Sequence, residues 1–388
     1  GRRVELVVRD LPSRANADAV MADLKRSGVE IVIGAYSSDL SIAASAAADR
    51  AGLLYWEAGA VADRLTGQGL PMVFRVGASG ANLGRNSADF AASELASRLG
   101  KQVADLRVAI AVADDAYANA VADAAETTAA ADGMPIVIRR SYNLSVPDFP
   151  AVMRDLEAAR PDVIILASHI PDGIAFRQQM VASGLKVGAL IGSTMAECDP
   201  DFAGELGSAA VGIFASDRPT AGFQSSALDP AAAATYARFA AAWGKDAPRS
   251  GASAGDGTGG DAYGRGYGSD GEDAEYTIHG PDEDATSEES EEALSGFSAA
   301  WALFHDVLPT TGGAFDASSV AAAARAIDLP EGSLPNGAGL RFSSDPARLG
   351  QNERAAAVIW QWQAVRTYEF VWPPTYATGS IAFVPLDR

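Results

Sequence analysis

The sequence predicts an α/β protein made of two lobes, each a doubly wound parallel sheet. Two stretches, Leu106–Ala113 and Asp162–Ala167, are apolar at nearly every position, which is typical of parallel strands covered on both faces. Such runs alternate with helical patterns, and the alternation restarts after Asp114-Asp115. With 388 residues and 48% hydrophobic content, the chain is long enough for two cores.

The first half of the chain predicts five strands separated by helices. Strands are expected at Val4–Val8, Ile31–Ile33, Leu53–Trp56, Met72–Val76 and Leu106–Ala113, and helices at Arg14–Arg26, from Ser37-Ser38 to near Gly52, and at Gly80–Leu99.

The second half continues the same alternation. Helices are expected at Ala116–Ala131, Phe149–Ala159, Ile174–Ser183, Ala231–Trp243, Leu294–Val307 and Ala317–Ile327, and strands at Pro135–Arg139, Asp162–Ala167, Ala189–Gly192, Val211–Ala215, Leu340–Phe342, Ala356–Val365 and Tyr368–Val371. The aromatic residues near the end of the chain are expected to be core.

Composition changes sharply in one internal segment. Gly, Ser, Asp and Glu dominate residues 247–293, where no apolar period survives, so we expect an acidic, Gly-rich, disordered insertion. The expected division is 1–115 plus 294–328 for lobe 1 and 116–246 plus 329–388 for lobe 2. Chain crossings between the lobes are expected near 114–116, 243–247 and 329–335.

Charge and rare residues exclude several classes of function. A net charge of −20 argues against nucleic-acid binding and against adhesion to anionic membranes. The single cysteine, Cys198, excludes an internal disulfide, and His169, His279 and His305 show no metal-ligand spacing. The G-x-S-x-G pattern at 251–255 has no strand before it or helix after it. We therefore expect no catalytic residue, no metal and no cofactor.

The turn after Ile31–Ile33 is the first candidate site. Ser37 and Ser38 open a helix whose first N–H groups lack partners, and such a helix start attracts an anion such as a carboxylate. Serine is also a preferred N-cap, so the same turn is compatible with a purely structural role.

Several segments in order resemble one family. GAYSS at Gly34–Ser38, VFRV at Val73–Val76, ADDAY at Ala113–Tyr117, then VIWQWQ and VWPPTYATG near the end are similar to the leucine/isoleucine/valine-binding family of ABC-transporter solute receptors, which have the type I periplasmic-binding-protein fold. The resemblance covers the chain apart from the insertion and implies two lobes joined by a hinge of several crossings.

The chain departs from this family in two places. The family begins with a central strand and a long first helix, and both are expected to be missing before Gly1, so the sequence looks like part of a longer precursor. The family also has small hydroxyl residues at its third ligand turn, where this chain has Glu57-Ala58-Gly59-Ala60-Val61. The carboxylate of Glu57 is expected either to meet a cationic ligand or to point to solvent.

Ligands of open parallel sheets bind beyond the carboxyl ends of the strands, so the turns there predict the cleft lining. The predicted ligand-binding residues are Tyr36, Ser37, Ser38, Glu57, Gly59 and Ala60 from lobe 1, and Tyr117, His169, Thr194 and Glu197 from the other side. The family's ammonium-binding carboxylate aligns nearest Thr194, with Glu197 the nearest acid. Alternatively, Tyr117 packs on its helix, His169 lies in a surface loop and Glu197 is solvated.

The resemblance implies an extracytoplasmic receptor, periplasmic or a cell-surface lipoprotein, that closes on a small polar solute and delivers it to an ABC permease. An amino acid, an amide or a related carboxylate is the expected solute; the altered turn at Glu57 also admits a cationic one. A sensory ligand-binding domain of the same fold is the alternative, and an enzyme on this scaffold would need a motif that the sequence does not contain.

Overall fold

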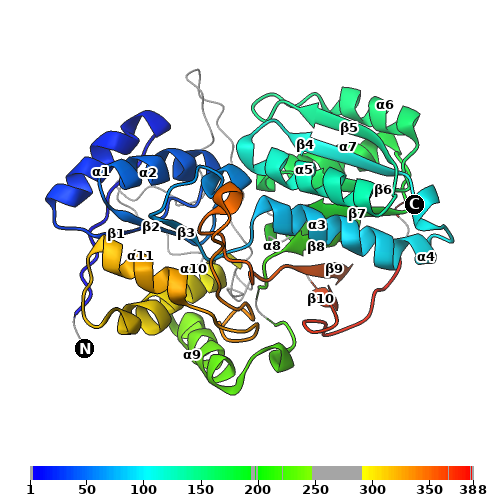
Figure 1. The fold of residues 1–388 in the computed structure, drawn as a ribbon. Helices are drawn as coiled ribbons and strands as arrows, with labels where there is room; N and C mark the ends of the chain where they lie inside the picture. Colours follow the sequence, from blue (N-terminus) through cyan, green and yellow to red (C-terminus); the bar gives the residue numbers. More distant parts are fainter. Residues whose placement is uncertain are drawn as a thin grey trace, which may run out of the picture.

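The computed structural model describes residues 3–193, 197, 200–220, 222–246, 291–365, 367–384 and 386. Two lobes lie side by side, each built on its own sheet (Figure 1). The predicted α/β architecture of two parallel-sheet lobes is therefore confirmed. Residues 247–290 of the expected insertion lie outside the described residues, whereas 291–293 begin a helix.

Lobe 1 has a three-stranded parallel sheet in the order β1-β2-β3. Its elements are α1 (Ala17–Arg26), β1 (Ile31–Ile33), α2 (Ser38–Arg50), β2 (Leu54–Glu57), β3 (Val73–Arg75), α10 (Glu291–Trp301) and α11 (Ala317–Ala326). Apolar residues of α1 and α2 form one core with the sheet, and those of α10 and α11 form another. The sheet is thus covered on both faces, which explains why β2 is buried at all of its positions.

Lobe 2 has a seven-stranded sheet in the order β10-β9-β8-β7-β6-β4-β5. Its elements are α3 (Gly80–Phe90), α4 (Ala96–Arg98), β4 (Val108–Ala113), α5 (Ala116–Ala131), β5 (Ile136–Tyr142), α6 (Phe149–Ala159), β6 (Val163–Ala167), α7 (Ile170–Ser183), β7 (Ala189–Ser193), α8 (Pro200–Leu206), β8 (Phe214–Asp217), β9 (Val358–Ala364) and β10 (Thr367–Trp372). Helix α9 (Pro230–Asp246), expected in lobe 2, instead lies beside α10 of lobe 1 (Figure 1), where Phe239 stacks on Phe297. Strands β4 to β8 are parallel, while β9 and β10 join antiparallel.

The order of these strands creates a crevice in lobe 2. From β4 the chain moves outward to β5 and then returns past β4 to β6. Right-handed crossovers therefore place α5 on one face of the sheet and α6 and α7 on the other. The loops that follow β4 and β6 part at this switch point, where open α/β sheets bind their ligands.

The expected lobe boundary at residue 115 is wrong for this fold. Strand β4 pairs with β5 and β6 inside the lobe 2 sheet, and α3 packs on α5, so the first crossing lies between Val76 and Gly80. The segment after Leu329 also differs from expectation, because Leu334, Leu340 and Phe342 pack in a lobe 1 core. The chain returns to lobe 2 only before β9.

Two expected strands are not found in the structure, and one helix was not expected. Residues 4–8 form no strand, and Val4, Leu6 and Val8 are exposed, since no described strand pairs with them. The segment 340–342 contributes isolated bridges, through Leu340 and Phe342, instead of a strand. Helix α8, in the stretch between β7 and β8, was not predicted.

The aromatic residues near the end of the chain are core, as predicted. Trp360, Trp362 and Phe370 are almost completely buried, and Tyr368 contacts all three rings. Within the part of the chain that the structure describes, no helix is long and apolar enough to cross a membrane.

Candidate functional site

A narrow cleft between the lobes gathers most of the predicted residues. Its described lining comprises Tyr36, Ser37, Ser38, Gly59 and Val61 from lobe 1 and Tyr117, His169 and Arg218 from lobe 2. The space between them is about 30 Å³, enough for little more than a water molecule. The lobes are therefore closed on one another in this structure.

The turn after β1 places two hydroxyls at this cleft. Ser37 caps α2, accepting a hydrogen bond from the backbone N–H of Leu40 at 3.5 Å. The Ser38 hydroxyl accepts from the backbone N–H of Ala62 at 3.1 Å, which ties this turn to the next one. Ser37 is therefore a helix cap, and it also lines the cleft, so the structural and the ligand-binding interpretations coexist.

Tyr36 forms part of the same turn in an uncommon conformation. Its φ is 62°, in the left-handed region that a tyrosine rarely adopts. Its ring lies against Gly59, where an added Cβ would come within 2.3 Å of Tyr36 Cδ2. The Tyr36 hydroxyl reaches Glu292 at 3.2 Å. The missing side chain at position 59 thus makes room for an aromatic wall of the cleft.

Glu57 is turned into lobe 1 and does not line the cleft. The side chain is 1% exposed, so the solvent-facing alternative is wrong. One carboxylate oxygen accepts from the N–H groups of residues 58, 59 and 60 at 2.9–3.1 Å, and the other accepts from Ser41 at 2.7 Å and Tyr55 at 3.2 Å. A Cβ on Gly34 would lie 2.1 Å from this second oxygen. Ala60, whose N–H is one of these donors, is also buried and away from the cleft lining.

Tyr117 and His169 lie together at the switch point of lobe 2. Their rings are 4.9 Å apart, and the Tyr117 hydroxyl donates to the Ser168 carbonyl at 3.2 Å. His169 Nε2 lies 2.9 Å from Asp115, and the His169 backbone N–H donates to Asp172. The surface-loop alternative for His169 is therefore wrong, since the residue is buried.

Charge surrounds the imidazole of His169. Burial works against its protonated form, but the hydrogen bond and charge of Asp115, with Asp172 behind it, raise the pKa of His169 above its usual value. Asp172 accepts a hydrogen bond from the hydroxyl of Tyr142 at 2.5 Å, and burial raises the pKa of Asp172. A continuous chain of polar side chains thus runs from the cleft into lobe 2.

Arg218 is the cleft residue that reaches across between the lobes. It follows β8 in lobe 2, is 2% exposed and donates from Nη1 to the carbonyl oxygen of Gly59 in lobe 1 at 2.9 Å. Its Nη2 donates to Glu291, the first residue of α10, at 2.9 Å, and Asp217 lies 3.4 Å from its Nε. Burial opposes its charge, but Glu291 and Asp217 raise the pKa of Arg218, which is therefore always a cation.

Two of the predicted lobe 2 residues are not placed at the cleft. Thr194 lies outside the described residues. Glu197 is 0% exposed, so its solvated alternative is wrong, and its carboxyl oxygens have no hydrogen-bond partner among the described residues. Burial raises the pKa of Glu197 well above its usual value, which favours the neutral acid. Its role as a ligand contact stays a prediction.

Sequence reasoning missed Arg218 and Val61. The signal for Arg218 was available, because it follows directly on the strand that ends at Asp217, and strand ends were the criterion for the other turns. Val61 was noted for the hydroxyl it lacks, and it contributes an apolar wall instead.

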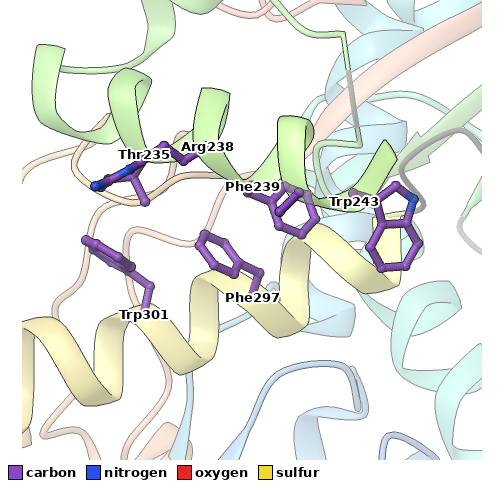
Figure 2. Close-up of a pocket in the computed structure, with 7 residues that line it drawn as sticks. Thr235, Arg238, Phe239, Trp243, Phe297 and Trp301 are labelled. Carbon is purple, nitrogen blue, oxygen red and sulfur yellow. The ribbon is translucent and has the colours of Figure 1, made fainter. Parts of the chain in front are cut away.

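A larger hollow of about 460 Å³ lies elsewhere, between α9 and α10 (Figure 2). Aromatic side chains face each other across it, with Phe239 and Phe297 stacked at 4.7 Å and Arg238 over the ring of Trp301. All of the residues that line this hollow lie on α9 and α10, and none follows a strand; Thr235 and Arg238 are its polar lining residues. The inter-lobe cleft, smaller but polar and at the switch point, is therefore the better candidate for a polar ligand.

Comparison with known proteins agrees with this geometry. Residues 1–275 match the family model described as "Periplasmic binding protein". A relative in Brucella abortus, "Leu/Ile/Val-binding protein homolog 8", is 28% identical over 357 residues, which cover 92% of this chain and 76% of the relative.

Solved structures share the fold at lower identity. The leucine-binding protein LivK of Thermotoga maritima aligns with a TM-score of 0.67 and 16% identity, covering 93% of this chain and 84% of that one. A solute-binding protein of an ABC transporter from R. palustris, in complex with 4-hydroxybenzoate, aligns with a TM-score of 0.65 and 17% identity over 96% and 83% of the two chains. This chain belongs to the periplasmic binding protein family and resembles its Leu/Ile/Val-binding branch, whose members bind solutes and are not enzymes.

Proposed function

We propose that this chain is the extracytoplasmic receptor of an ABC importer and captures a small polar solute in the cleft between its lobes. An amino acid, an amide or a related carboxylate is the solute class, and the permease of the importer is the partner. The family supports an extracytoplasmic location and a small-molecule ligand.

One observation carries this proposal. Hydroxyls from the start of α2, Ser37 and Ser38, face Tyr117, His169 and Arg218 from the other lobe across one small space. A solute that contacts both groups stabilises the closed form over the open one, which is the thermodynamic requirement for capture by closure.

The closed cleft and its crossings fit a hinge mechanism. Because the space is only about 30 Å³, an amino acid enters only if the lobes part. The chain passes between the lobes before α3, between β8 and α9, and before β9, where short segments can absorb the rotation (Figure 1).

A thermal-shift screen of the purified protein tests the binding step. The panel contains amino acids, amides, polyamines and aromatic acids, and a ligand at a hundred times its Kd adds about 2.7 kcal/mol of stability. We expect a hit that the double substitution Ser37→Ala with Ser38→Ala removes. A well-folded sample with no shift for any class would contradict the proposal.

The importer assignment needs a second assay. We expect the ligand-loaded protein to stimulate ATP hydrolysis by its ABC permease in proteoliposomes. Ligand binding without any stimulation would favour the sensory alternative.

A further inference from the structure

Arg218 lies at a point where it can control the hinge. It is the first residue after β8, at the start of the crossing that leads from lobe 2 to α9. We infer that Arg218 is a hinge latch, a side chain that holds the lobes closed before any solute is bound, and that Glu291 and Asp217 position its guanidinium. This inference rests on the proposed function, because it concerns the closing motion of the same receptor.

The contact between Arg218 and Gly59 joins the two lobes directly. Gly59 belongs to the turn after β2 in lobe 1, and its carbonyl oxygen accepts a hydrogen bond from Arg218 Nη1 at 2.9 Å. Both residues line the cleft, and Arg218 is almost completely buried, so this hydrogen bond lies in a region of low dielectric. A rotation that parts the turn after β2 from the end of β8 must break it.

Two carboxylates hold the guanidinium in the orientation that reaches Gly59. Glu291 Oε2 accepts from Arg218 Nη2 at 2.9 Å, and Glu291 Oε1 lies 2.5 Å from Nε, so both oxygens face one edge of the planar group. Ser295 donates to the same carboxylate at 2.9 Å, and Asp217 lies 3.4 Å from Nε. Because Glu291 fixes this edge, Nη1 is turned toward lobe 1.

The helix that carries Glu291 is itself fixed to lobe 1. The indole Nε1 of Trp56 on β2 donates to the carbonyl oxygen of Ala299 on α10 at 2.9 Å. The second residue of α10, Glu292, accepts from the Tyr36 hydroxyl at 3.2 Å. Lobe 1 therefore holds the Arg218 side chain from two sides, at the turn after β2 and at the start of α10, although its backbone follows a lobe 2 strand.

These contacts are made by the protein alone, so they act before a solute arrives. The apparent affinity of a two-state receptor falls with the fraction of molecules that are not in the binding-competent form. A latch made of the protein's own side chains raises the closed fraction of the ligand-free protein, while the open form stays as a minor state through which a solute enters.

Distances between the lobes of the ligand-free protein test the latch. Ala19 on α1 and Val146 in lobe 2 are exposed, and their cysteine variants carry spin labels for double electron–electron resonance. Cys198→Ser removes the single native cysteine, so only these two sites are labelled. We expect one dominant population in the otherwise wild-type protein, with a distance that matches this closed structure.

Arg218→Lys is the first variant for this measurement. It keeps the positive charge, but a single ammonium cannot face Glu291 with two nitrogens and the Gly59 carbonyl with a third. The lobes should therefore separate more often, and a second, open population should appear. We expect the ratio of open to closed molecules to rise about tenfold, as for the loss of one buried hydrogen bond to a charged group.

Glu291→Gln is the second variant and tests the positioning role. It leaves the guanidinium paired with Asp217, so no lone charge is buried, and it should also raise the open population. Exposed residues of α6 supply the matched controls, Arg154→Lys and Glu157→Gln. Thermal unfolding shows which variants are folded.

Two results would overturn the latch. One is a ligand-free protein with native Arg218 that is mainly open, and the other is a folded Arg218→Lys variant with the same distance distribution as its parent. A solute found in the thermal-shift screen supports the receptor function whichever way these distances fall, so the latch and the proposed function fail separately.

Discussion

The two rims of the cleft are built at the same place, the carboxyl ends of parallel strands, but they are held in different ways. On the lobe 1 rim, Glu57 and Arg75 are buried and tie the backbone of the turn that follows β2. On the lobe 2 rim, Asp115, His169 and Asp172 form a titratable chain that reaches the cleft.

The difference separates a fixed rim from one that responds to its surroundings. The N–H groups of residues 58 to 60 and the carbonyl oxygens of Ala60 and Ala62 are satisfied within the lobe, so that rim is preorganised whether or not a ligand is present. The lobe 2 rim carries the His169 imidazole, whose pKa Asp115 and Asp172 raise above its ordinary value against the effect of burial. Variants of the first rim should change stability at every pH, and variants of the second should do so in a pH-dependent way.

The largest effect is expected at Arg75. Burial lowers the pKa of this guanidinium to about 10, which still leaves it charged at neutral pH, and it donates to the carbonyl oxygens of Ala60 and Ala62 and to Gln351. Arg75→Met should cost about 3–5 kcal/mol in the free energy of unfolding, because buried acceptors lose their partner. Urea unfolding measures the loss, with the exposed Arg64→Met as control. A loss no larger than that of the control would contradict a fixed lobe 1 rim.

A smaller loss is expected at Glu57. Glu57→Ala leaves three N–H groups and the hydroxyl of Ser41 without their acceptor and should cost about 3 kcal/mol. Glu57→Gln keeps an acceptor oxygen and should cost less than about 1.5 kcal/mol. Thermal unfolding compares the two, with the exposed Glu205→Ala as control. Equal losses in both variants would show that shape, and not hydrogen bonding, holds the turn.

On the lobe 2 rim, Tyr142 supports Asp172 from inside the lobe. Tyr142→Phe removes one hydroxyl that donates to this carboxylate and should cost about 2 kcal/mol. It should also raise the pKa of Asp172 further, because a hydrogen bond to the charged form is lost. Unfolding at several pH values measures both effects. If the loss in unfolding free energy for Tyr142→Phe does not depend on pH, the hydroxyl of Tyr142 has no influence on the protonation of Asp172.

The smallest effect, and the one that varies with pH, is expected at His169. Its folded pKa is raised above the unfolded value of about 6.5, so its charged contacts stabilise the fold fully below pH of about 6.5. That stability is lost as the pH rises through the folded pKa. The difference in unfolding free energy between wild type and His169→Gln should therefore shrink by about 1 kcal/mol between pH 6 and pH 9.

An exposed histidine provides the control for this measurement. The side chain of His305 is 60% exposed, so His305→Gln, measured over the same pH range, is the matched control. If the difference in unfolding free energy between wild type and His169→Gln instead widens as the pH rises, the pKa of His169 is not raised. The contrast between the two rims would then fail as well.

The hydrophobic pattern of the sequence predicted helices and strands well where its periodicity was clear. Helices α5 and α6 have the bounds expected from the sequence, and β4 and β6 differ by two residues or fewer, because a 3.6-residue period and a short apolar run are local properties. Val4–Val8 has the alternation of a strand but no described partner, and an unpaired strand is not stable.

The site was predictable to the extent that strand ends locate it. Six of the ten nominated residues, Tyr36, Ser37, Ser38, Gly59, Tyr117 and His169, line the cleft. The orientation of Glu57 was not predictable, because it depends on the small residue at Gly34 and on donors from Ser41 and Tyr55 that come together only in the folded lobe.

The sequence by itself determined the class of fold and the turn at Ser37-Ser38, because buried parallel strands and helix starts have local signatures. Only the tertiary structure decided that β4 belongs to lobe 2, since any apolar strand can join either sheet and the crossovers make the choice. It also decided that Arg218 meets Gly59 across the cleft, because a contact between residues 159 positions apart depends on how the two lobes close.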